Sequence, residues 1–76
     1  MDLTRLPIGQ TAVIQDLKCT GNIRRRLLDL GLVPGSLIKA LRRSPIGDPT
    51  AYEIRDTIIA LRREIGSQVI ISKPDC

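Results

Sequence analysis

Turn-forming residues cut this chain into short segments, and that spacing limits what it can fold into. The breaks fall at residues 7–9, 21–22, 34–35, 44–49 and 66–67. No apolar run between them approaches the roughly 20 residues that a membrane-spanning helix needs. A chain of 76 residues has room for one hydrophobic core. We therefore predict one domain, 1–76, with no direct insertion into a membrane.

Most of the segments have the composition of short β-strands. They are rich in β-branched residues, alternate between apolar and polar positions, and are bounded by turn signals. The expected strands cover residues 11–17, 36–43, 50–55, 57–61 and 67–73. The alternation predicts four inward-facing side chains, Ile38, Ala40, Tyr52 and Ile54, and the final strand runs through Val69 and Ile71.

One segment has a strong helical pattern. Ile23, Leu27 and Leu30 recur at i, i+4 and i+7 and so share one face. Gly31 follows, and glycine is the residue that most often ends a helix in the left-handed conformation. We expect this apolar face to cover one mouth of the β-structure. Residues 62–66 can form a single short helical turn.

These elements predict a mainly β fold. Five short strands in a chain too small for two layers close most economically into a small barrel, which also removes exposed strand edges. The helix is inserted after the first strand.

The charge balance is basic. Twelve Lys and Arg, nine of them Arg, stand against eight Asp and Glu. This excess suits acidic partners, but small soluble domains commonly carry a few net charges of one sign. Nucleic-acid binding stays an alternative, although Tyr52 is the only aromatic residue and no helix-turn-helix pair is recognisable. We therefore do not expect a nucleic-acid partner.

The sequence offers no catalytic constellation. There is no His, so the two thiols, Cys19 and Cys76, have no imidazole base beside them, and no glycine-rich loop matches a phosphate cradle. We predict a protein that is not an enzyme, with no catalytic residues. Two isolated cysteines and an N-terminus without a signal peptide favour the cytoplasm.

A metal site is not evident either. Metal sites need clustered thiols and imidazoles or converging carboxylates. Asp48 and Glu53 could approach one another, but two carboxylates make a weak site. We predict no metal ligands and no definite cofactor, while direct binding of a divalent transition metal, iron or zinc, stays open.

The tripeptide 32–34 is apolar although it directly follows a helix end. It either caps the barrel or forms an exposed patch for a partner. An apolar patch beside basic charge suits protein–protein contact. The predicted contact surface is Arg24, Arg25, Leu32 and Val33.

Several motifs in order resemble those of one family. Residues 26–35, RLLDLGLVPG, are followed by SPIGDP at 44–49, IALR at 59–62 and VII at 69–71. Together they resemble the FeoA family over residues 11–72. Asp56 stands where this family commonly has glycine, and Asp tolerates the left-handed conformation.

The resemblance implies an SH3-like barrel with the helix after the first strand, a fold that also occurs as the C-terminal domain of iron-dependent repressors. It implies an accessory role in ferrous-iron transport beside the membrane transporter FeoB. The implied action is contact with the cytosolic, guanine-nucleotide-binding part of FeoB. Family members are often labelled as binding transition metals, so a metal sensor or carrier is the alternative.

Overall fold

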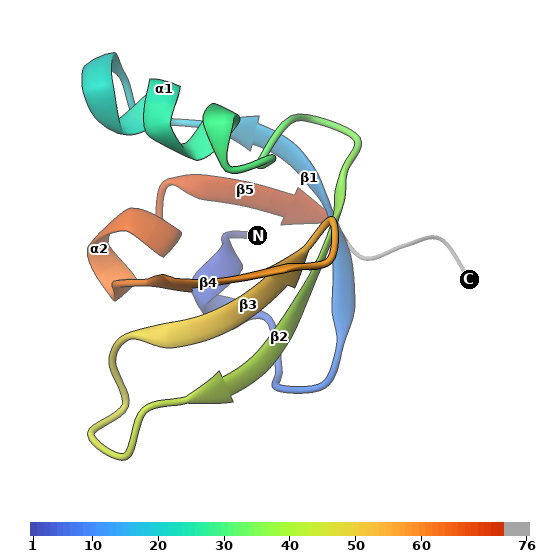
Figure 1. The fold of residues 1–76 in the computed structure, drawn as a ribbon, viewed down its shortest axis with the longest axis vertical. Helices are drawn as coiled ribbons and strands as arrows, with labels where there is room; N and C mark the ends of the chain where they lie inside the picture. The colour runs from blue at the N-terminus through green and yellow to red at the C-terminus, as the bar shows by residue number, and fades with distance from the viewer. Residues whose placement is uncertain (73–76) are drawn as a thin grey trace.

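The computed structural model describes residues 1–72. Five strands, one longer helix, one short helix and one 3-10 helix make up the fold (Figure 1). In chain order these elements are η1 (Leu3–Arg5), β1 (Thr11–Leu17), α1 (Gly21–Asp29), β2 (Leu37–Arg43), β3 (Thr50–Ile54), β4 (Thr57–Leu61), α2 (Arg63–Gly66) and β5 (Val69–Ser72). The predicted mainly β fold with a helix after the first strand is confirmed.

The five strands form one antiparallel sheet in the order β4-β3-β2-β1-β5. Register shifts between Ile14 and Asp16 and between Ala40 and Arg42 mark irregularities, and such bulges bend a strand and increase its twist. The edge strands β4 and β5 are consecutive in the chain and joined by α2 (Figure 1). Within residues 1–72 these two edges do not pair with each other. The barrel is therefore open between β4 and β5, and the expectation that closure removes all edges is wrong.

The core lies on the concave side of the sheet. The four side chains predicted to face inward are buried, as are Val69 and Ile71 of the final strand, each with at most 4% of its surface exposed. Side-chain alternation along β2, β3 and β5 thus supplies part of the core. Burying an aliphatic side chain of this size contributes about 1.5–3 kcal/mol.

The N-terminal segment adds two side chains to the core, Leu3 and Leu6, which the sequence did not predict. Leu3 and Leu6 are buried at either side of η1, and η1 packs against α2 and β5. Asp2 caps η1 through its carboxylate, which accepts the backbone N–H of Thr4 at 2.9 Å. The Met1 carbonyl accepts the N–H of Ile71 at 2.8 Å, so the N-terminal residues cover the outer edge of β5. Two apolar residues three positions apart are too short a pattern to identify such a segment.

Helix α1 ends at a glycine, as predicted. Gly31 has φ +105°, its N–H bonds to the Leu28 carbonyl at 3.0 Å, and the Leu32 N–H bonds to the Leu27 carbonyl at 3.0 Å. These two bonds define a Schellman motif, in which the second residue after the helix end packs against the residue that accepts its N–H. Leu32 and Leu27 are accordingly both buried.

The apolar face of α1 covers the core less completely than predicted. Only Leu27 is buried, while Ile23 and Leu30 are 44% and 37% exposed. The expectation that all three residues close the mouth of the barrel is therefore wrong for two of them. Neither helix of the described chain is long and apolar enough to cross a membrane.

The hairpin between β3 and β4 has a two-residue turn. Arg55 and Asp56 both have positive φ, +49° and +64°. Two consecutive left-handed residues form the type I′ turn, whose twist matches that of the flanking strands. Asp56 thus adopts the conformation expected where the FeoA pattern has glycine, and β3 ends one residue earlier than predicted.

Candidate functional site

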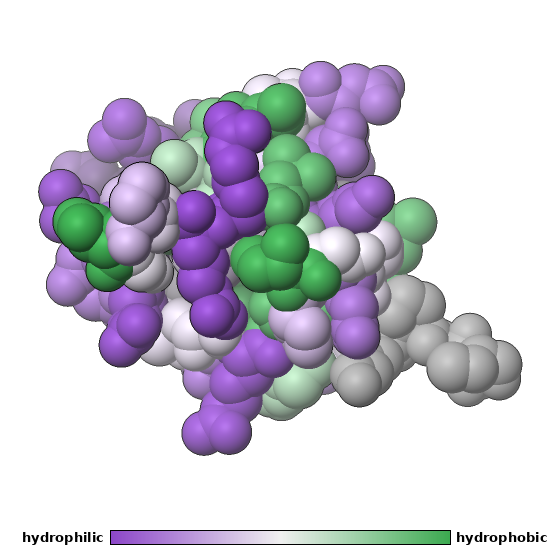
Figure 2. Space-filling view, turned by 90° about the horizontal axis from the view of Figure 1, so that it is seen from below, coloured by the Kyte–Doolittle hydropathy of each residue, from purple (hydrophilic) through white to green (hydrophobic). Residues whose placement is uncertain are grey.

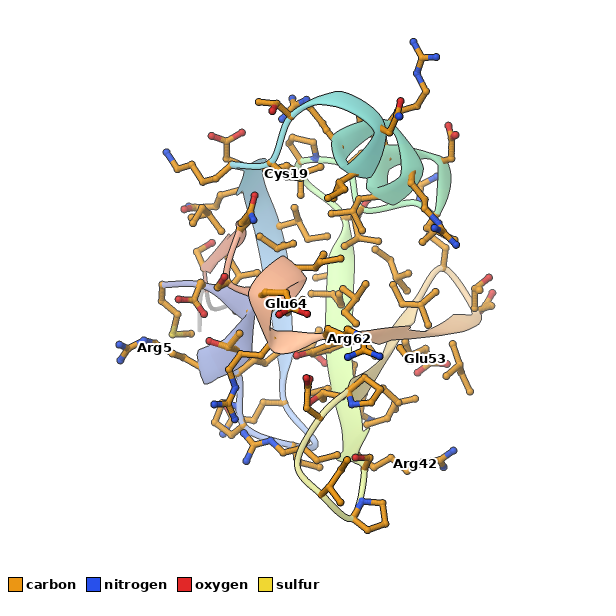
Figure 3. All side chains as sticks on the ribbon, turned by 90° about the vertical axis from the view of Figure 1, so that its left-hand side faces the viewer. Arg5, Cys19, Arg42, Glu53, Arg62 and Glu64 are labelled. Atoms are coloured by element: carbon orange, nitrogen blue, oxygen red, sulfur yellow. The ribbon has the colours of Figure 1, made fainter. Side chains whose placement is uncertain are left out.

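An apolar groove lies between α1 and the segment where β4 leads into α2. Its volume is about 290 Å³. Six apolar and two basic residues line it: Ile23, Leu27, Leu30, Ala60, Leu61, Ile65, Arg26 and Arg62. Figure 3 shows Arg62 where β4 passes into α2. An apolar cleft flanked by two guanidinium groups suits a partner that carries both apolar and acidic side chains.

The groove exposes apolar side chains. Covering them with a partner would be favourable because it removes apolar surface from water. Leu27 and Leu61 form its buried part, whereas Ile23 and Leu30 are open to solvent on the helix. Ile58, at 62% exposure, extends the apolar character along β4. Apolar residues gathered in this way mark interaction sites more often than isolated ones do.

Other exposed apolar side chains lie outside the residues that line the groove. On the face seen from below, green apolar side chains reach the surface among purple hydrophilic ones (Figure 2). Ile46, in the loop between β2 and β3, is 89% exposed. A single exposed apolar residue is ordinary in a soluble protein and needs no partner.

Within residues 1–72, the strand that borders the groove has one edge without a neighbouring strand. Ile54 and Thr57 face each other across the two-residue turn and Ile58 faces Glu53. In such a hairpin the backbone groups of alternate residues point away from the neighbouring strand, here those of Ile58 and Ala60. No backbone hydrogen bond from elsewhere in residues 1–72 reaches these two residues. The groove therefore combines apolar side chains with unpaired strand backbone.

The four residues predicted as a contact surface differ in their exposure. Leu32 is fully buried, because it packs in the Schellman motif, so its prediction as a surface residue is wrong. Val33 and Arg24 are half-buried, and Arg24 Nη1 donates to the Leu17 carbonyl at 2.8 Å. Arg24 thus ties α1 to the end of β1. Of the four, Arg25 alone is exposed.

The carboxylates considered as metal ligands lie apart. Asp48 accepts the backbone N–H of Arg63, whereas Glu53 lines a different cavity beside β2. Among residues 1–72 there is no group of three Cys, His, Asp or Glu side chains that could hold a metal ion. Cys19 is buried near the start of α1 (Figure 3), and Cys76 lies outside the described residues. The described side chains do not fit a transition-metal site.

The comparison with known families decides the relationship. A model of the FeoA domain matches residues 1–73. The chain belongs to the FeoA family. The predicted family is therefore confirmed.

Three relatives show what this FeoA-family chain is similar to. An Fe(2+) transport protein A/FeoB fusion protein of Porphyromonas gingivalis is 36% identical over 69 residues, which cover 91% of this chain and 8% of the fusion protein. The iron(II) transport protein A of Clostridium thermocellum is 32% identical with a TM-score of 0.91, over 96% of this chain and 45% of that one. This chain thus spans less than half the length of these two relatives.

The third relative is FeoA of Stenotrophomonas maltophilia, described as a prokaryotic SH3 domain protein complexed with zinc. It is 29% identical with a TM-score of 0.85, over 95% of this chain and 89% of that one. The expected SH3-like fold is confirmed by this likeness.

The groove was not predicted from the sequence. The helical stripe of Ile23, Leu27 and Leu30 was recognised, but all of it was expected to face the core. The sequence did contain one signal for the groove, because apolar residues continue onto β4 at Ile58 and Ala60. These two residues alternate with the inward-facing Ile59 and Leu61.

Proposed function

We propose that this protein is a cytoplasmic accessory factor of ferrous-iron transport that binds the cytosolic part of FeoB. The observation that carries the proposal is the groove between α1 and β4, with its free strand edge. The fusion of FeoA and FeoB in the P. gingivalis relative supports it, because covalent fusion keeps two interacting partners at high effective concentration.

The geometry favours an extended segment of FeoB as the occupant. An added strand would pair with the outward backbone groups of Ile58 and Ala60, as in other β-augmentation complexes. Its apolar side chains would fill the groove beside Ile23 and Leu30. Acidic residues flanking the segment would face Arg26 and Arg62, where charge complementarity speeds association and fixes the register.

In this role the protein binds a partner and catalyses no reaction. A partner seated in the groove touches two elements at once, α1 and β4. Binding would therefore fix the helix relative to the sheet and present a defined FeoA surface to the transporter.

The direct test uses the purified cytosolic part of FeoB and measures its affinity for wild type and variants. Ile23→Asp and Leu30→Asp place charge in the groove, and each is expected to weaken binding at least about tenfold, since a lost apolar anchor is worth more than about 1.4 kcal/mol. Arg25 lies two residues from Ile23, so it faces away from the groove. Arg25→Glu is the matched control and should bind within about twofold of wild type.

A backbone variant separates strand pairing from side-chain contact. Ala60→Pro removes an outward N–H without removing a bond to β3, which edge strands tolerate. Weakened binding by a variant that keeps its amide spectrum supports strand addition. Equal binding by the folded Ile23→Asp and Leu30→Asp variants, or loss on Arg25→Glu alone, would rule out the groove.

A metal sensor or carrier is the second candidate function, favoured by the zinc complex of the S. maltophilia relative. Residues 1–72 supply no ligand set for it. Anaerobic titration of the reduced protein with ferrous or zinc ion decides between the two. A saturable site tighter than millimolar would support the metal candidate, and its absence would remove it.

A further inference from the structure

A second cavity lies on the η1 side of α2, and Leu61 is the one residue that lines both this cavity and the groove. Its volume is about 290 Å³. Arg62 borders the groove, whereas its neighbour Arg63 borders this cavity. The wall is polar and comes from η1, the ends of β2 and β3, the loop between them, and the start of α2.

Three arginines meet at this cavity from distant parts of the sequence. Arg5 is the last residue of η1, Arg43 ends β2 and Arg63 begins α2. All three are exposed, and Arg5 extends into solvent from η1 in Figure 3. All three are basic side chains on the wall of one small cavity, and an anion bound there would be attracted by their positive charge.

Hydroxyl groups complete the wall. Tyr52 and Thr50 on β3 line the cavity, as does Thr4 on η1, whose hydroxyl already donates to the Asp2 carboxylate. Tyr52 is 4% exposed, and its burial raises the pKa of the phenol. The group therefore stays neutral and keeps an O–H to donate. Guanidinium and hydroxyl donors together are the usual ligands of phosphate oxygens.

One carboxylate also lines the cavity and has to be counted. The Asp48 carboxylate would repel a bound anion, but its Oδ1 already accepts the backbone N–H of Arg63 at 2.9 Å. Asp2 likewise lies near Tyr52, and its carboxylate accepts the N–H and hydroxyl of Thr4. Three guanidinium groups against these two carboxylates leave a positive excess.

We propose that this cavity binds a phosphate-class anion with one or two phosphoryl groups. Its volume lies just below the range of about 300–1,000 Å³ that accommodates a drug-sized ligand. A phosphate or pyrophosphate fits, whereas a nucleoside would extend into solvent. The planar fork of arginine matches phosphate oxygens in a bidentate manner, which explains why these donors are arginines here. The site is independent of the groove and of the proposed contact with FeoB.

The test is a titration of the isotope-labelled protein with pyrophosphate, followed by backbone amide shifts at constant ionic strength. Saturable shifts are expected at Gly47, Thr50 and Arg63. Arg43→Gln and Arg63→Gln should each reduce the affinity about tenfold, because each removes charged hydrogen bonds to the anion. Arg63→Gln keeps the backbone N–H that Asp48 accepts. Arg25→Gln removes the same charge far from the cavity and should leave the affinity unchanged.

Further ligands distinguish the sources of the phosphate. Inorganic phosphate that binds as well as pyrophosphate indicates a single-phosphoryl site. A nucleoside triphosphate that binds no better than pyrophosphate indicates that only the phosphates are recognised. Shifts that rise linearly without saturation, equal shifts with potassium chloride, or equal weakening by Arg25→Gln would overturn the proposal. Affinity for duplex DNA without affinity for pyrophosphate would do so too.

Discussion

Asp48 caps helix α2 from a distant part of the chain, since its Oδ1 accepts the backbone N–H of Arg63 at 2.9 Å. The residue at the helix start, Arg62, makes no side-chain capping bond of its own. The loop that carries Asp48 is held in place locally, because Ser44 Oγ donates to the Asp48 carbonyl at 2.8 Å. One hydrogen bond thus joins the loop between β2 and β3 to the start of α2, the short helix between β4 and β5.

Loss of this cap should lower stability measurably. Asp48→Ala leaves the Arg63 N–H without its partner, and we expect a decrease of about 1 kcal/mol in the free energy of unfolding, typical of a lost cap. Asp48→Asn keeps an oxygen acceptor and should lose less. Urea unfolding of both variants gives the comparison. Equal stability of wild type and Asp48→Ala would show that the bond contributes nothing in solution.

Two glycines with similar backbone angles offer a matched pair of substitutions. Gly31 and Gly35 have φ +105° and +94°, but a Cβ at Gly31 would lie 3.3 Å from Arg55 Cδ, while one at Gly35 meets nothing within 4 Å. Gly35→Ala should cost about 1–2 kcal/mol from backbone strain alone. Gly31→Ala should cost more than Gly35→Ala, because the Arg55 side chain must also shift.

The Arg55 contribution can be separated by a double variant. In an Arg55→Ala background, Gly31→Ala should cost no more than Gly35→Ala does, as measured by chemical unfolding. An excess that persists in this background would place the additional strain elsewhere.

Local patterns predicted the parts of the fold that depend on local geometry. Alternation along β2 and β3 correctly placed Ile38 and Tyr52, because successive strand residues point to opposite faces whatever the topology. Gly31 ended α1 because the left-handed position favours glycine. The same motif would also have predicted a buried Leu32, since its second residue packs on the helix.

The features that depend on tertiary placement could not be predicted in this way. A helical stripe does not reveal how wide an opening it must cover, so the exposure of Ile23 and Leu30 was missed. The anion cavity brings Arg5 together with Arg43 and Arg63 through the sheet topology. Nothing in the spacing of three residues so far apart indicates that they meet.

Because Leu32 is buried and not at the surface, shortening its side chain should lower the stability of the protein. Leu32→Ala should lower the free energy of unfolding by about 2–5 kcal/mol, because truncation of a fully buried leucine leaves a cavity. Leu37, at 57% exposure, is the matched control, and Leu37→Ala should change stability by no more than about 0.5 kcal/mol. Thermal or urea unfolding compares the two. Similar small losses would mean that Leu32 is accessible after all.

Tyr52 should make the protein less stable in alkali. Burial raises the pKa of its phenol above the ordinary value, with Thr50 and Arg43 opposing the rise. The fold therefore favours the neutral form, so this stabilisation is complete below about pH 10, where the unfolded phenol titrates, and is lost as pH rises towards the folded pKa. The loss can reach about 1.4 kcal/mol per pH unit across that interval.

Two measurements isolate this effect. Tyr52 is the only tyrosine, so the ultraviolet absorbance of phenolate follows this one group, and its midpoint should lie above that of the unfolded chain. The difference in unfolding free energy between wild type and Tyr52→Phe should be constant up to about pH 10 and then fall for wild type. Arg43→Gln removes one of the groups that oppose the rise, so it should move the phenolate midpoint still higher. Two results together would contradict this prediction: a phenolate midpoint equal to that of the unfolded protein, and a difference in unfolding free energy against Tyr52→Phe that does not change with pH. They would mean that the phenol is hydrated in the folded protein and not buried.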